Sequence, residues 1–598
     1  MFNKPHRLKK NKSSFFPQEI IFLDTETYNS TPNLDNELHL LKYGFAQFVS
    51  YRNLKSNKRT PTNFEFTDNN KFHQFVLEHA RKRRKLNILA SNVWFDIRVT
   101  GIDLFLMQQG WRNTRIYQNG LITIINFKLD DFHIQFLSLQ NFIPFSIKAI
   151  GKLINLPKLE VEFDEVSFDE LKIYCKRDTE ILRLGFEYWI KLCKESDFGN
   201  FGVTLPSQAF NAYRHKYMEH AIFIHDDPET IELERKSYFG GRTECFYIGE
   251  IHHQNTYKLD VNSLYPHVMQ QNFFPTKLIN KIINPSAKML EEILRNYCVI
   301  ADCDISIDKS FVAYRHKQHT LFPTGNIRGC FCTGTLQRLI SKGSINKIHT
   351  AAVYLQSKLF KSYVTDLNDK KIQAGIDNDF IKRSIYKLFL NSLYGKFGQR
   401  KKREKYSFKT ELDFTRNEIV YHKPDEMRYH VLAYGGKETW FEQTQENSFN
   451  AFVAIASHVT DYARLHLLDA MEIVQAGNYF YCDTDSLFVN LQGYQNILPF
   501  IHDNELGKWK VEGVTDYCKI RNPKDYTFGS EVKLKGISKN AKQLGEDLYQ
   551  QAYFPTFKTS LRDGIVEGFV IKSVTKKIKG IYLKATVGLD GWTIPFVF

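Results

Sequence analysis

The sequence predicts a multidomain chain of mixed α/β and α+β architecture. At 598 residues with 43% hydrophobic side chains, the chain can fill several hydrophobic cores and is too long for one ordinary domain. Runs rich in β-formers alternate with segments of helical periodicity, which is typical of mixed α/β domains. No repeat of 20–50 residues and no long low-complexity stretch is visible, which argues against a solenoid.

The charge balance favours a partner that carries phosphate. Lys and Arg number 81 against 66 Asp and Glu, a formal net charge of +15. Such a surface suits a polyanion, although a basic protein without such a partner has similar odds on charge alone. Residues 1–17 form a basic tail without acids, for which a DNA contact, a disordered end and a targeting segment are the alternatives.

The nine cysteines show no pairing signature, which indicates a reducing, intracellular setting. His316, His319, Cys330 and Cys332 have the ligand types of a zinc site. Their short Cys-x-Cys gap favours ordinary loop and strand residues instead. No apolar run approaches the roughly 20 residues that span a bilayer, so we expect no membrane association.

Carboxylates stand at the ends of predicted elements in the first third of the chain. The buried-type strand Glu19–Thr27 places Asp24 and Glu26 on one face, because side chains alternate along a strand. The segment Asn87–Thr100 is predicted as a strand and a turn that present Asp96.

A helix over Leu171–Glu195 closes this N-terminal region near residue 196. Tyr174 and Asp178 lie one turn apart on it and share a face. The first carboxylate set therefore comprises Asp24, Glu26, Asp96 and Asp178.

Four buried carboxylates repel one another and lose hydration, so they are tolerable only if protonated or neutralised by cations. Two divalent metals about 4 Å apart can hydrolyse a phosphodiester by activating water and stabilising the leaving oxygen. Tyr174 could orient that water, and Lys158 could offset charge on the scissile phosphate. The first set therefore indicates hydrolysis at a DNA end.

A second carboxylate set follows the same logic. The strand Tyr257–Val261 carries Asp260, and a hairpin over Tyr479–Val489 holds Asp483 and Asp485 at its turn. Two strands with carboxylates at adjacent ends can hold two Mg²⁺ ions, one for an attacking hydroxyl and one for a triphosphate.

A helix predicted over Phe380–Phe397 lies between these acidic elements. Lys387, Asn391 and Tyr394 form one polar stripe along it, and Arg383 lies one turn before Lys387. Such a stripe is usually a solvated face, but the flanking aspartates favour cations for phosphates and an aromatic ring for the nascent base pair.

The motifs resemble those of family B DNA polymerases. FLDTET (22–27), NVWFD (92–96) and YCKRD (174–178) are similar to the three motifs of the DEDDy proofreading exonuclease. DVNSLYP (260–266), KLFLNSLYGKFG (387–398) and YCDTDS (481–486) resemble polymerase motifs A, B and C in that chain order. The resemblance implies a DNA-directed DNA polymerase that carries a 3′→5′ exonuclease.

The resemblance also implies roles for individual residues. The metal ligands would be Asp24, Glu26, Asp96, Asp178, Asp260, Val261 and Asp485. Asp483 would support them. Each site would hold two Mg²⁺ ions, for which Mn²⁺ can substitute. The incoming nucleotide would contact Val261, Tyr265, Arg383, Lys387, Asn391 and Tyr394. The Tyr265 ring would lie under the sugar and exclude a ribose 2′-hydroxyl, so the product is expected to be DNA.

Further residues would contact DNA. By resemblance, Asn92 and Phe95 would hold the frayed primer end, and Ser138, Leu139 and Phe142 of LSLQNF would grip single-stranded DNA. For the two phenylalanines, core positions are the alternative. SYFGG (237–241) is similar to a YxGG linker, in which Tyr238, Gly240 and Gly241 would approach the template. KDY (524–526) is similar to a KxY motif, in which Lys524 and Tyr526 would steady the primer. The basic runs 81–85 and 400–403 are further candidates for phosphate contact.

The implied architecture is an RNase H-like exonuclease followed by a right-hand polymerase. The expected boundaries are tail 1–17, exonuclease 18–196 and polymerase 197–598, with palm 232–270 and 440–545, insertion 1 at 271–355, fingers 356–398, insertion 2 at 399–433 and thumb 546–598. The spacing of the motifs leaves no room for the additional N-terminal domain of larger replicative members.

The positions of the two insertions are similar to those of protein-primed members, which start on a hydroxyl of a terminal protein. Expected partners are template and primer DNA, dNTPs, a terminal protein and a single-stranded DNA-binding protein, with the chain a monomer in a host cytoplasm or a mitochondrion. Two alternatives stay open: an enzyme that extends ordinary nucleic-acid primers, and a non-catalytic DNA-binding protein on the same fold.

Overall fold

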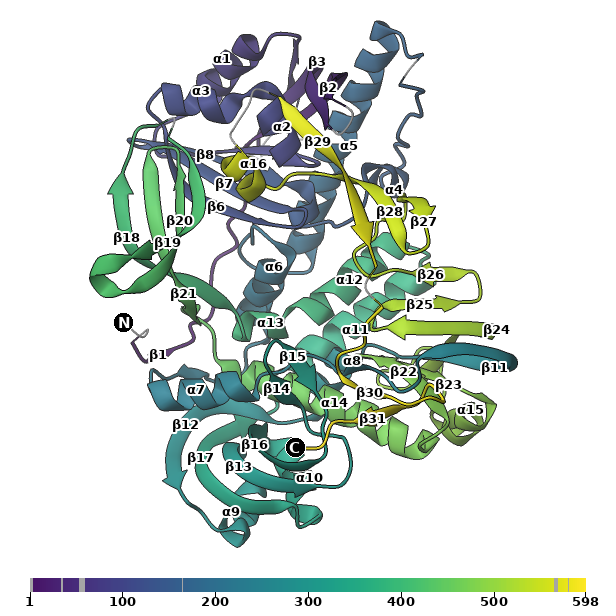
Figure 1. The fold of residues 1–598 in the computed structure, drawn as a ribbon. Coiled ribbons are helices and arrows are strands. Elements are labelled where there is room, and N and C mark those ends of the chain that lie inside the picture. The colour runs from purple at the N-terminus through teal and green to yellow at the C-terminus, as the bar shows by residue number, and fades with distance from the viewer. Residues whose placement is uncertain are drawn as a thin grey trace.

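The computed structural model describes residues 4–33, 36–52, 60–163, 165–412, 414–563, 568–578 and 580–598. Its elements are mixed helices and strands in several sheets, as the sequence predicts. The N-terminal sheet and its helices lie at the top of Figure 1, and the palm sheet and a further sheet lie below them. Among the described residues, no helix is both long enough and apolar enough to cross a bilayer.

The N-terminal domain is built on one large sheet. β2 (Glu19–Asn33) pairs in parallel with β5 (Lys85–Ala90), and β5 pairs in parallel with β8 (Phe132–Ser138). On the other side β2 pairs antiparallel with β3 (Asn36–Ser50). The helix α5 (Phe168–Glu195) packs on β2 and β3, and a capping box fixes its start. The middle of β2 and the buried side of α5 therefore come together.

The palm is an antiparallel sheet in the order β10-β22-β23-β11-β24-β25-β26. β11 (Gly249–Val261) is central, with the hairpin β22 (Tyr479–Asp483) and β23 (Ser486–Val489) on one side and β24 (Trp509–Asn522) on the other. The long helix α14 (Val453–Val474) is buried along most of its length and belongs to the same core as β11 and β23. This arrangement places the ends of motifs A and C side by side.

The fingers differ from the sequence prediction in one respect. The expected single helix is divided at Leu393 into α12 (Phe380–Ser392) and α13 (Tyr394–Phe397). The Ser392 hydroxyl bonds back to the Leu388 carbonyl at 2.6 Å, a contact that commonly bends helices.

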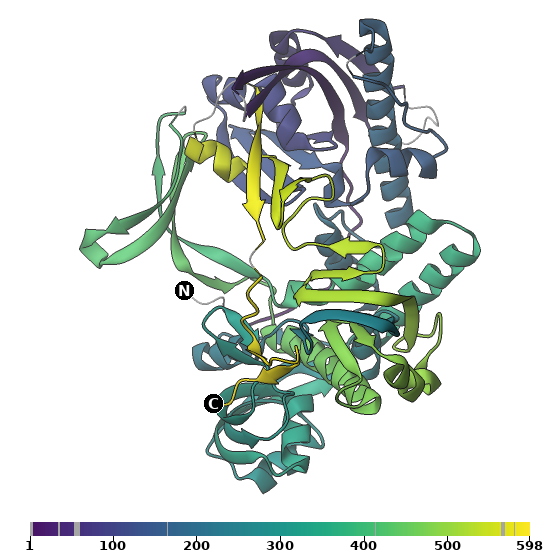
Figure 2. The ribbon, with the colours of Figure 1, turned by 45° about the vertical axis from the view of Figure 1, so that its right-hand side comes forward.

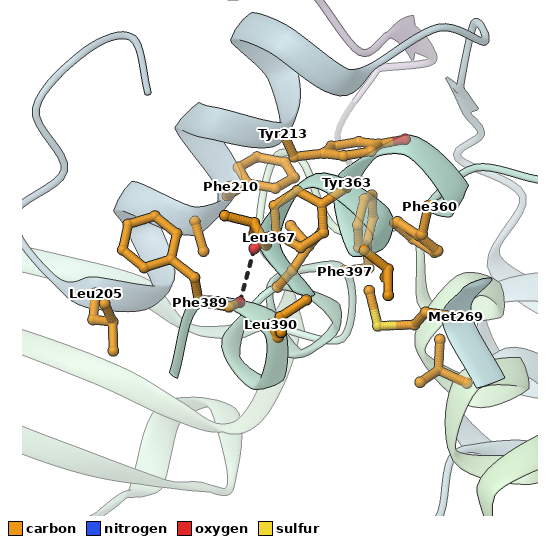
Figure 3. Packing of buried hydrophobic residues seen from close by; sticks show 14 of the residues in the cluster. Leu205, Phe210, Tyr213, Met269, Phe360, Tyr363, Leu367, Phe389, Leu390 and Phe397 are labelled. Carbon is orange, nitrogen blue, oxygen red and sulfur yellow. Dashed lines mark hydrogen bonds between the residues drawn. The ribbon is translucent and has the colours of Figure 1, made fainter. Parts of the chain in front are cut away.

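The fingers are held together by an aromatic core that α12 shares with α11 (Lys361–Ile376). Figure 3 shows this packing, with Phe389 and Phe397 turned into the cluster. The hydroxyl of Tyr363 on α11 donates to the Phe389 carbonyl at 2.8 Å, which ties the two fingers helices together.

The two segments expected as insertions each form a sheet. The first contains β12 (Phe274–Ile283), β13 (Cys298–Ile307), β16 (Gly325–Cys332) and β17 (Ile345–Ser357). It lies at the bottom of Figure 1, below the palm.

The second insertion sheet extends beyond the expected end at 433. Its strands are β18 (Arg400–Lys409), β19 (Arg416–His422), β20 (Met427–Tyr434) and β21 (Lys437–Asn447). β20 and β21 form a hairpin whose two-residue turn is Gly435–Gly436, with φ of 61° and 77°. Positive φ at both turn positions is the geometry of a tight hairpin and favours glycine, so the chain continues in pairing to Asn447. We call the four strands the β18–β21 sheet.

The basic tail is ordered where it is described. β1 (His6–Arg7) pairs with β9 (Phe223–Ile224) at the edge of the first insertion sheet, and Leu8 is buried. The backbone amide of Leu8 donates to the Ile222 carbonyl at 2.8 Å. The interpretation of this tail as a disordered end is therefore wrong for the described residues.

The C-terminal region connects the two domains. β27 (Lys542–Gly545), β28 (Leu548–Tyr553) and β29 (Phe569–Lys577) continue the N-terminal sheet, because β29 pairs with β3. The short strands β30 (Ala585–Val587) and β31 (Thr593–Pro595) then return to the palm and first insertion. In Figure 2 this yellow segment runs from the N-terminal sheet down past the palm. The expected thumb thus shares a sheet with the expected exonuclease.

Candidate active sites

The structure brings the first carboxylate set together. Asp24 and Glu26 lie on β2, Asp96 on α2 (Val93–Thr100) and Asp178 on α5. Burial is the main cause that raises the pKa of Asp24, and the charges of Glu26, Asp178 and Asp96 add to it. Burial likewise raises the pKa of Glu26 to about 8 and that of Asp96 to about 7. Three segments that are distant in sequence thus bring four acids close enough to influence one another's charge.

Lys158 contacts both Asp178 and Tyr174. The Lys158 ammonium bonds to Asp178 Oδ2 and lies 4.3 Å from the centroid of the Tyr174 ring. Thr25 Oγ1 donates to Asp96 Oδ1 at 2.8 Å. Each acid except Asp24 and Glu26 therefore has a neutral or cationic partner that fixes its orientation.

The segment expected to grip single-stranded DNA needs a correction. Phe142 is fully buried against Phe186, Trp189 and Phe201, so its ring is a core side chain and cannot stack on a base. The aromatic residue of this segment that remains half exposed is Phe145.

Ser138 and Leu139 are also buried side chains. Ser138 Oγ accepts the Val93 amide at 3.2 Å, and the Leu139 side chain belongs to the core. Neither side chain can grip a strand directly. The Ser138 contact instead fixes the start of α2, next to Asn92.

Asn92 and Phe95 lie at the start of α2, close to Asp96 in the chain. Both are half-buried beside Asp96. The Phe95 ring lies 5.2 Å from the Phe569 ring of β29 and 5.8 Å from His39. A residue from the C-terminal strands thus completes this aromatic corner.

The second carboxylate set also converges. In the register of the palm sheet, Asp260 on β11 pairs with Ser486, the residue after Asp485. The amide of Val261 donates to the Asp485 carbonyl at 2.8 Å. Burial raises the pKa of Asp260 to about 6, and the neighbouring Asp485 adds to this shift. The Val261 side chain is buried, so only its backbone can serve as a ligand.

The turn between Asp483 and Asp485 requires a glycine opposite it. Thr484 adopts the left-handed conformation with φ of 64°, and its side chain would lie 2.7 Å from a Cβ placed on Gly241. A larger residue at 241 would displace the acidic turn. Gly240 has open space around it, so no such constraint acts there.

Asp483 forms an ion pair with Lys524 of the KDY segment (524–526). Lys524 Nζ lies 2.8 and 2.7 Å from its two carboxylate oxygens. Tyr526 differs from the expectation, because its ring is buried against Tyr481 and Phe488 and its hydroxyl donates to Glu531 at 3.4 Å. Lys524 therefore lies at the site, held by Asp483, whereas the Tyr526 ring is part of the palm core.

The cations and rings of the fingers face the palm acids. Lys387 is close enough to stabilise the charged forms of Asp260 and Asp485, and its ammonium is exposed, as is Arg383. Tyr394 stacks on Tyr265, and Asn391 lies one turn before Tyr394. Tyr238 packs at Gly398, just after α13.

Comparison with known proteins gives the family. The sequence model of DNA polymerase type B, organellar and viral, matches residues 160–474, more than half of the chain. The chain belongs to this family. The expected family is thereby confirmed.

Individual relatives agree with this family. The chain is 26% identical over 460 residues to a DNA-directed DNA polymerase of Enterobacteria phage PRD1, covering 74% of this chain and 75% of the relative. It is 24% identical over 501 residues to a DNA polymerase of Streptococcus phage Cp-1, covering 77% and 80%. A probable DNA polymerase of Neurospora intermedia is 23% identical over 66% of this chain, but the match spans only 40% of that relative.

The fold is similar to that of a solved DNA polymerase. The Phi29 DNA polymerase complexed with primer-template DNA and incoming nucleotides has a TM-score of 0.68 and 16% identity, covering 94% of this chain and 100% of that structure. The expected fold class is thereby confirmed.

The structure does not bring His316, His319, Cys330 and Cys332 together, so the interpretation of these residues as a zinc site is wrong. Cys330 and Cys332 are buried in β16, whereas His316 and His319 face each other in a separate hairpin. In the part of the chain that the structure describes, the one set of three His, Cys, Asp or Glu ligand atoms within 4.8 Å is Asp24, Glu26 and Cys175. All nine cysteines are buried thiols without disulfides.

Three residues near the palm site were missed by the sequence analysis. Lys371 Nζ donates to Ser263 Oγ at 3.3 Å, Lys510 Nζ lies 3.5 Å from Asp260, and Glu512 contacts Lys510 at 3.1 Å. No motif marks them, because they come from α11 and β24 and meet the motifs only in the fold. The alternation of β24 could have placed Lys510 and Glu512 on one face, but not beside Asp260.

Proposed function

We propose that the chain is a DNA-directed DNA polymerase with a 3′→5′ proofreading exonuclease, which starts synthesis on a terminal protein. The observation that carries the proposal is the presence of two separate clusters of carboxylates, one on β2, α2 and α5 and one on β11 and the β22–β23 hairpin. A binding protein on this fold would have no need to keep both clusters of costly buried acids.

Both clusters fit divalent cations, Mg²⁺ with Mn²⁺ as a substitute. Asp178 Oδ1 is buried without a hydrogen-bond partner among the described residues, and Asp24, Glu26 and Asp96 have raised pKa values. Hard oxygen ligands of this kind suit Mg²⁺. Asp24, Glu26, Asp96 and Asp178 would hold the ions of one site, and Asp260, Asp485 and the Val261 carbonyl those of the other. When bound, the ions would lower the pKa of the attacking oxygen and stabilise charge on the leaving oxygen.

At the exonuclease site, the protein's own groups position the end of a strand. The Phe95 ring offers a surface for an unpaired base, and Asn92 lies beside it at the start of α2. The Tyr174 hydroxyl can orient the attacking water, and Lys158, held by Asp178, can neutralise the scissile phosphate.

At the polymerase site, cations converge on the place of a triphosphate. Lys387 and Arg383 on α12 and Lys371 on α11 repel one another in the absence of an anion, which helps to lower the pKa of Lys371 to about 8. A bound triphosphate would remove this repulsion. The Tyr265 ring, stacked on Tyr394, would fill the space that a ribose 2′-hydroxyl needs.

The β18–β21 sheet supports processive synthesis. Asn417 Nδ2 on β19 donates to the Lys558 carbonyl of α16 (Phe557–Asp563) at 2.7 Å, so the sheet and the C-terminal region meet. In Figure 2 the yellow helix α16 lies between the β18–β21 sheet at the left and the N-terminal sheet at the top. Elements that encircle a duplex would retain it without a separate clamp.

Incubation of the chain with Mg²⁺, labelled dNTPs and a candidate terminal protein encoded beside it tests protein priming. A covalent protein–nucleotide adduct, absent with Asp485→Asn, supports the proposal. Extension of a nucleic-acid primer without any adduct would instead identify an enzyme that uses ordinary primers. If neither the adduct nor the extended primer formed, the proposed polymerase function would be contradicted.

A further inference from the structure

A buried hydrogen-bonded contact connects the β18–β21 sheet to the N-terminal domain. The hydroxyl of Tyr434, the last residue of β20, donates to Asp103 Oδ2 at 2.7 Å across 331 positions of sequence. Arg98 Nη1 donates to the two oxygens of the same carboxylate at 2.7 and 2.8 Å. All three side chains are almost completely buried, at 2% exposure or less.

The contact lies on the helix that carries a candidate exonuclease ligand. Arg98 and Asp96 both belong to α2, and Asp103 belongs to α3 (Ile102–Gln108), which follows after the left-handed Gly101. Thr100 Oγ1 donates to the Asp96 carbonyl at 2.7 Å, so the end of α2 is held as one unit. A shift of Arg98 therefore moves Asp96 with it.

Aromatic rings close the same junction. The Phe557 ring of α16 lies 4.9 Å from the Tyr434 ring and 5.3 Å from Trp94 on α2, both edge to face. The Arg98 guanidinium lies 5.8 Å from the Trp94 ring. One face of α2 thus contacts the β18–β21 sheet and the C-terminal region, while Asp96 and Phe95 face the carboxylates and β29.

We propose that Tyr434 is a positioning residue for the exonuclease site. Through Asp103 and Arg98 it fixes the orientation of α2, and so the position of Asp96. Because Tyr434 belongs to the β18–β21 sheet, the orientation of α2 depends on where that sheet lies. The inference rests on the proposed exonuclease and deepens it. The sheet and α16 are elements expected to lie along DNA, so their position on the duplex would be transmitted to the hydrolytic site.

The physical basis is the sensitivity of metal-assisted hydrolysis to ligand placement. Partners that orient a metal ligand typically change activity by about 10–100-fold when they are removed. The Asp103 carboxylate accepts hydrogen bonds from both the sheet and α2, and a charged acceptor buried in this way makes a strong hydrogen bond. Loss of the Tyr434 hydroxyl leaves the Arg98–Asp103 ion pair and the ring packing in place, so the fold is expected to persist.

Tyr434→Phe tests the proposal, with Tyr429→Phe as the matched control. Tyr429 lies on the same strand, is equally buried, and donates its hydroxyl to Asp425 within the β18–β21 sheet. For Tyr434→Phe we expect kcat for digestion of a single-stranded oligonucleotide to fall by about 10-fold, with KM nearly unchanged. Single-nucleotide incorporation on a primer–template should stay at the wild-type rate in both variants.

Two further readouts separate positioning from a general loss of stability. In Tyr434→Phe the Mg²⁺ concentration for half-maximal digestion should rise, and the amides of α2 should exchange hydrogen faster than in Tyr429→Phe. An unchanged kcat for digestion in Tyr434→Phe, an equal fall in Tyr429→Phe, or a parallel loss of incorporation would overturn the inference. Absence of digestion by the wild-type chain would instead overturn the proposed exonuclease itself.

Discussion

The rings of Tyr265 and Tyr394 stack, with centroids 4.7 Å apart and planes inclined by 28°. Tyr265 follows the left-handed Ser263 at the start of α8 (Leu264–Gln271), and Tyr394 opens α13. Motif A and motif B thus meet through two aromatic faces. A ring held in this way cannot swing aside to admit a larger sugar.

Replacement of Tyr265 by valine should admit ribonucleotides. The smaller side chain leaves space for the 2′-hydroxyl, and one such contact changes discrimination by about 10- to 200-fold. The ratio of kcat/KM for dNTP and rNTP on one template measures the effect. Tyr265→Phe keeps the ring and serves as the control; wild-type discrimination in Tyr265→Val would exclude Tyr265 as the sugar contact.

Nucleotide binding should weaken above about pH 8 because Lys371 loses its positive charge. Burial and the nearby Arg383, Lys387 and Lys510 lower its pKa to about 8, so the ammonium that would bind phosphate loses its proton as the pH rises through that value. The KM for dNTP should therefore increase between about pH 7 and 9. Lys371→Arg keeps its charge and should flatten this rise; an equally steep profile in that variant would assign the pH dependence to another group.

Mg²⁺ should stabilise the protein more at high pH than at low pH. The pKa of Glu26 is raised to about 8 and that of Asp96 to about 7 in the folded protein, so their ionisation destabilises the metal-free fold as the pH rises from about 4 through those values. Mg²⁺ offsets this cost and competes with protons at low pH.

The gain in Tm on addition of Mg²⁺ should thus increase from about pH 6 to 9. The double variant Asp24→Asn/Glu26→Gln should lose most of this increase and retain only the part due to the palm site. A gain that does not depend on pH in the wild-type chain would show that these acids do not bind the metal.

Alanine substitutions of Phe142 and Phe145 should affect different properties, the first the stability of the fold and the second the binding of single-stranded DNA. Phe142→Ala removes a fully buried ring and should destabilise the fold by about 3–5 kcal/mol in chemical denaturation. Phe145→Ala removes a ring that is partly buried against the core and should cost less stability than Phe142→Ala. Its binding of single-stranded DNA should weaken by about 1–3 kcal/mol if the ring stacks on a base. Unchanged binding by Phe145→Ala would exclude that contact.

The sequence predicts the acids better than the residues around them. Asp24 and Glu26 lie two residues apart on β2, in a period that strand geometry fixes, although β2 continues to Asn33 and does not end at Thr27 as expected. Asp260, Asp483 and Asp485 lie in short motifs, so local patterns suffice for these acids. Phe142 carries no local sign of its burial, because the rings that cover it come from α5 and from Phe201.

The remaining features depend on contacts between distant segments. Lys371, Lys510 and Glu512 reach the palm site from α11 and β24, and the Tyr434–Asp103 contact joins the second insertion to the N-terminal domain. Likewise, the pairing of β29 with β3 merges two expected domains into one sheet. No periodicity within a single segment contains such information.

The separation of the two activities tests the central claim most directly. Extension of a primer on a template and digestion of a single strand are measured for Asp485→Asn and for Asp24→Asn/Glu26→Gln. Loss of a partner that only orients a metal ligand costs about 10–100-fold, so loss of a ligand should cost at least about 100-fold. We predict that Asp485→Asn loses extension and keeps digestion, and that the double variant does the reverse. Loss of both activities in either protein, or retention of both, would contradict two independent sites.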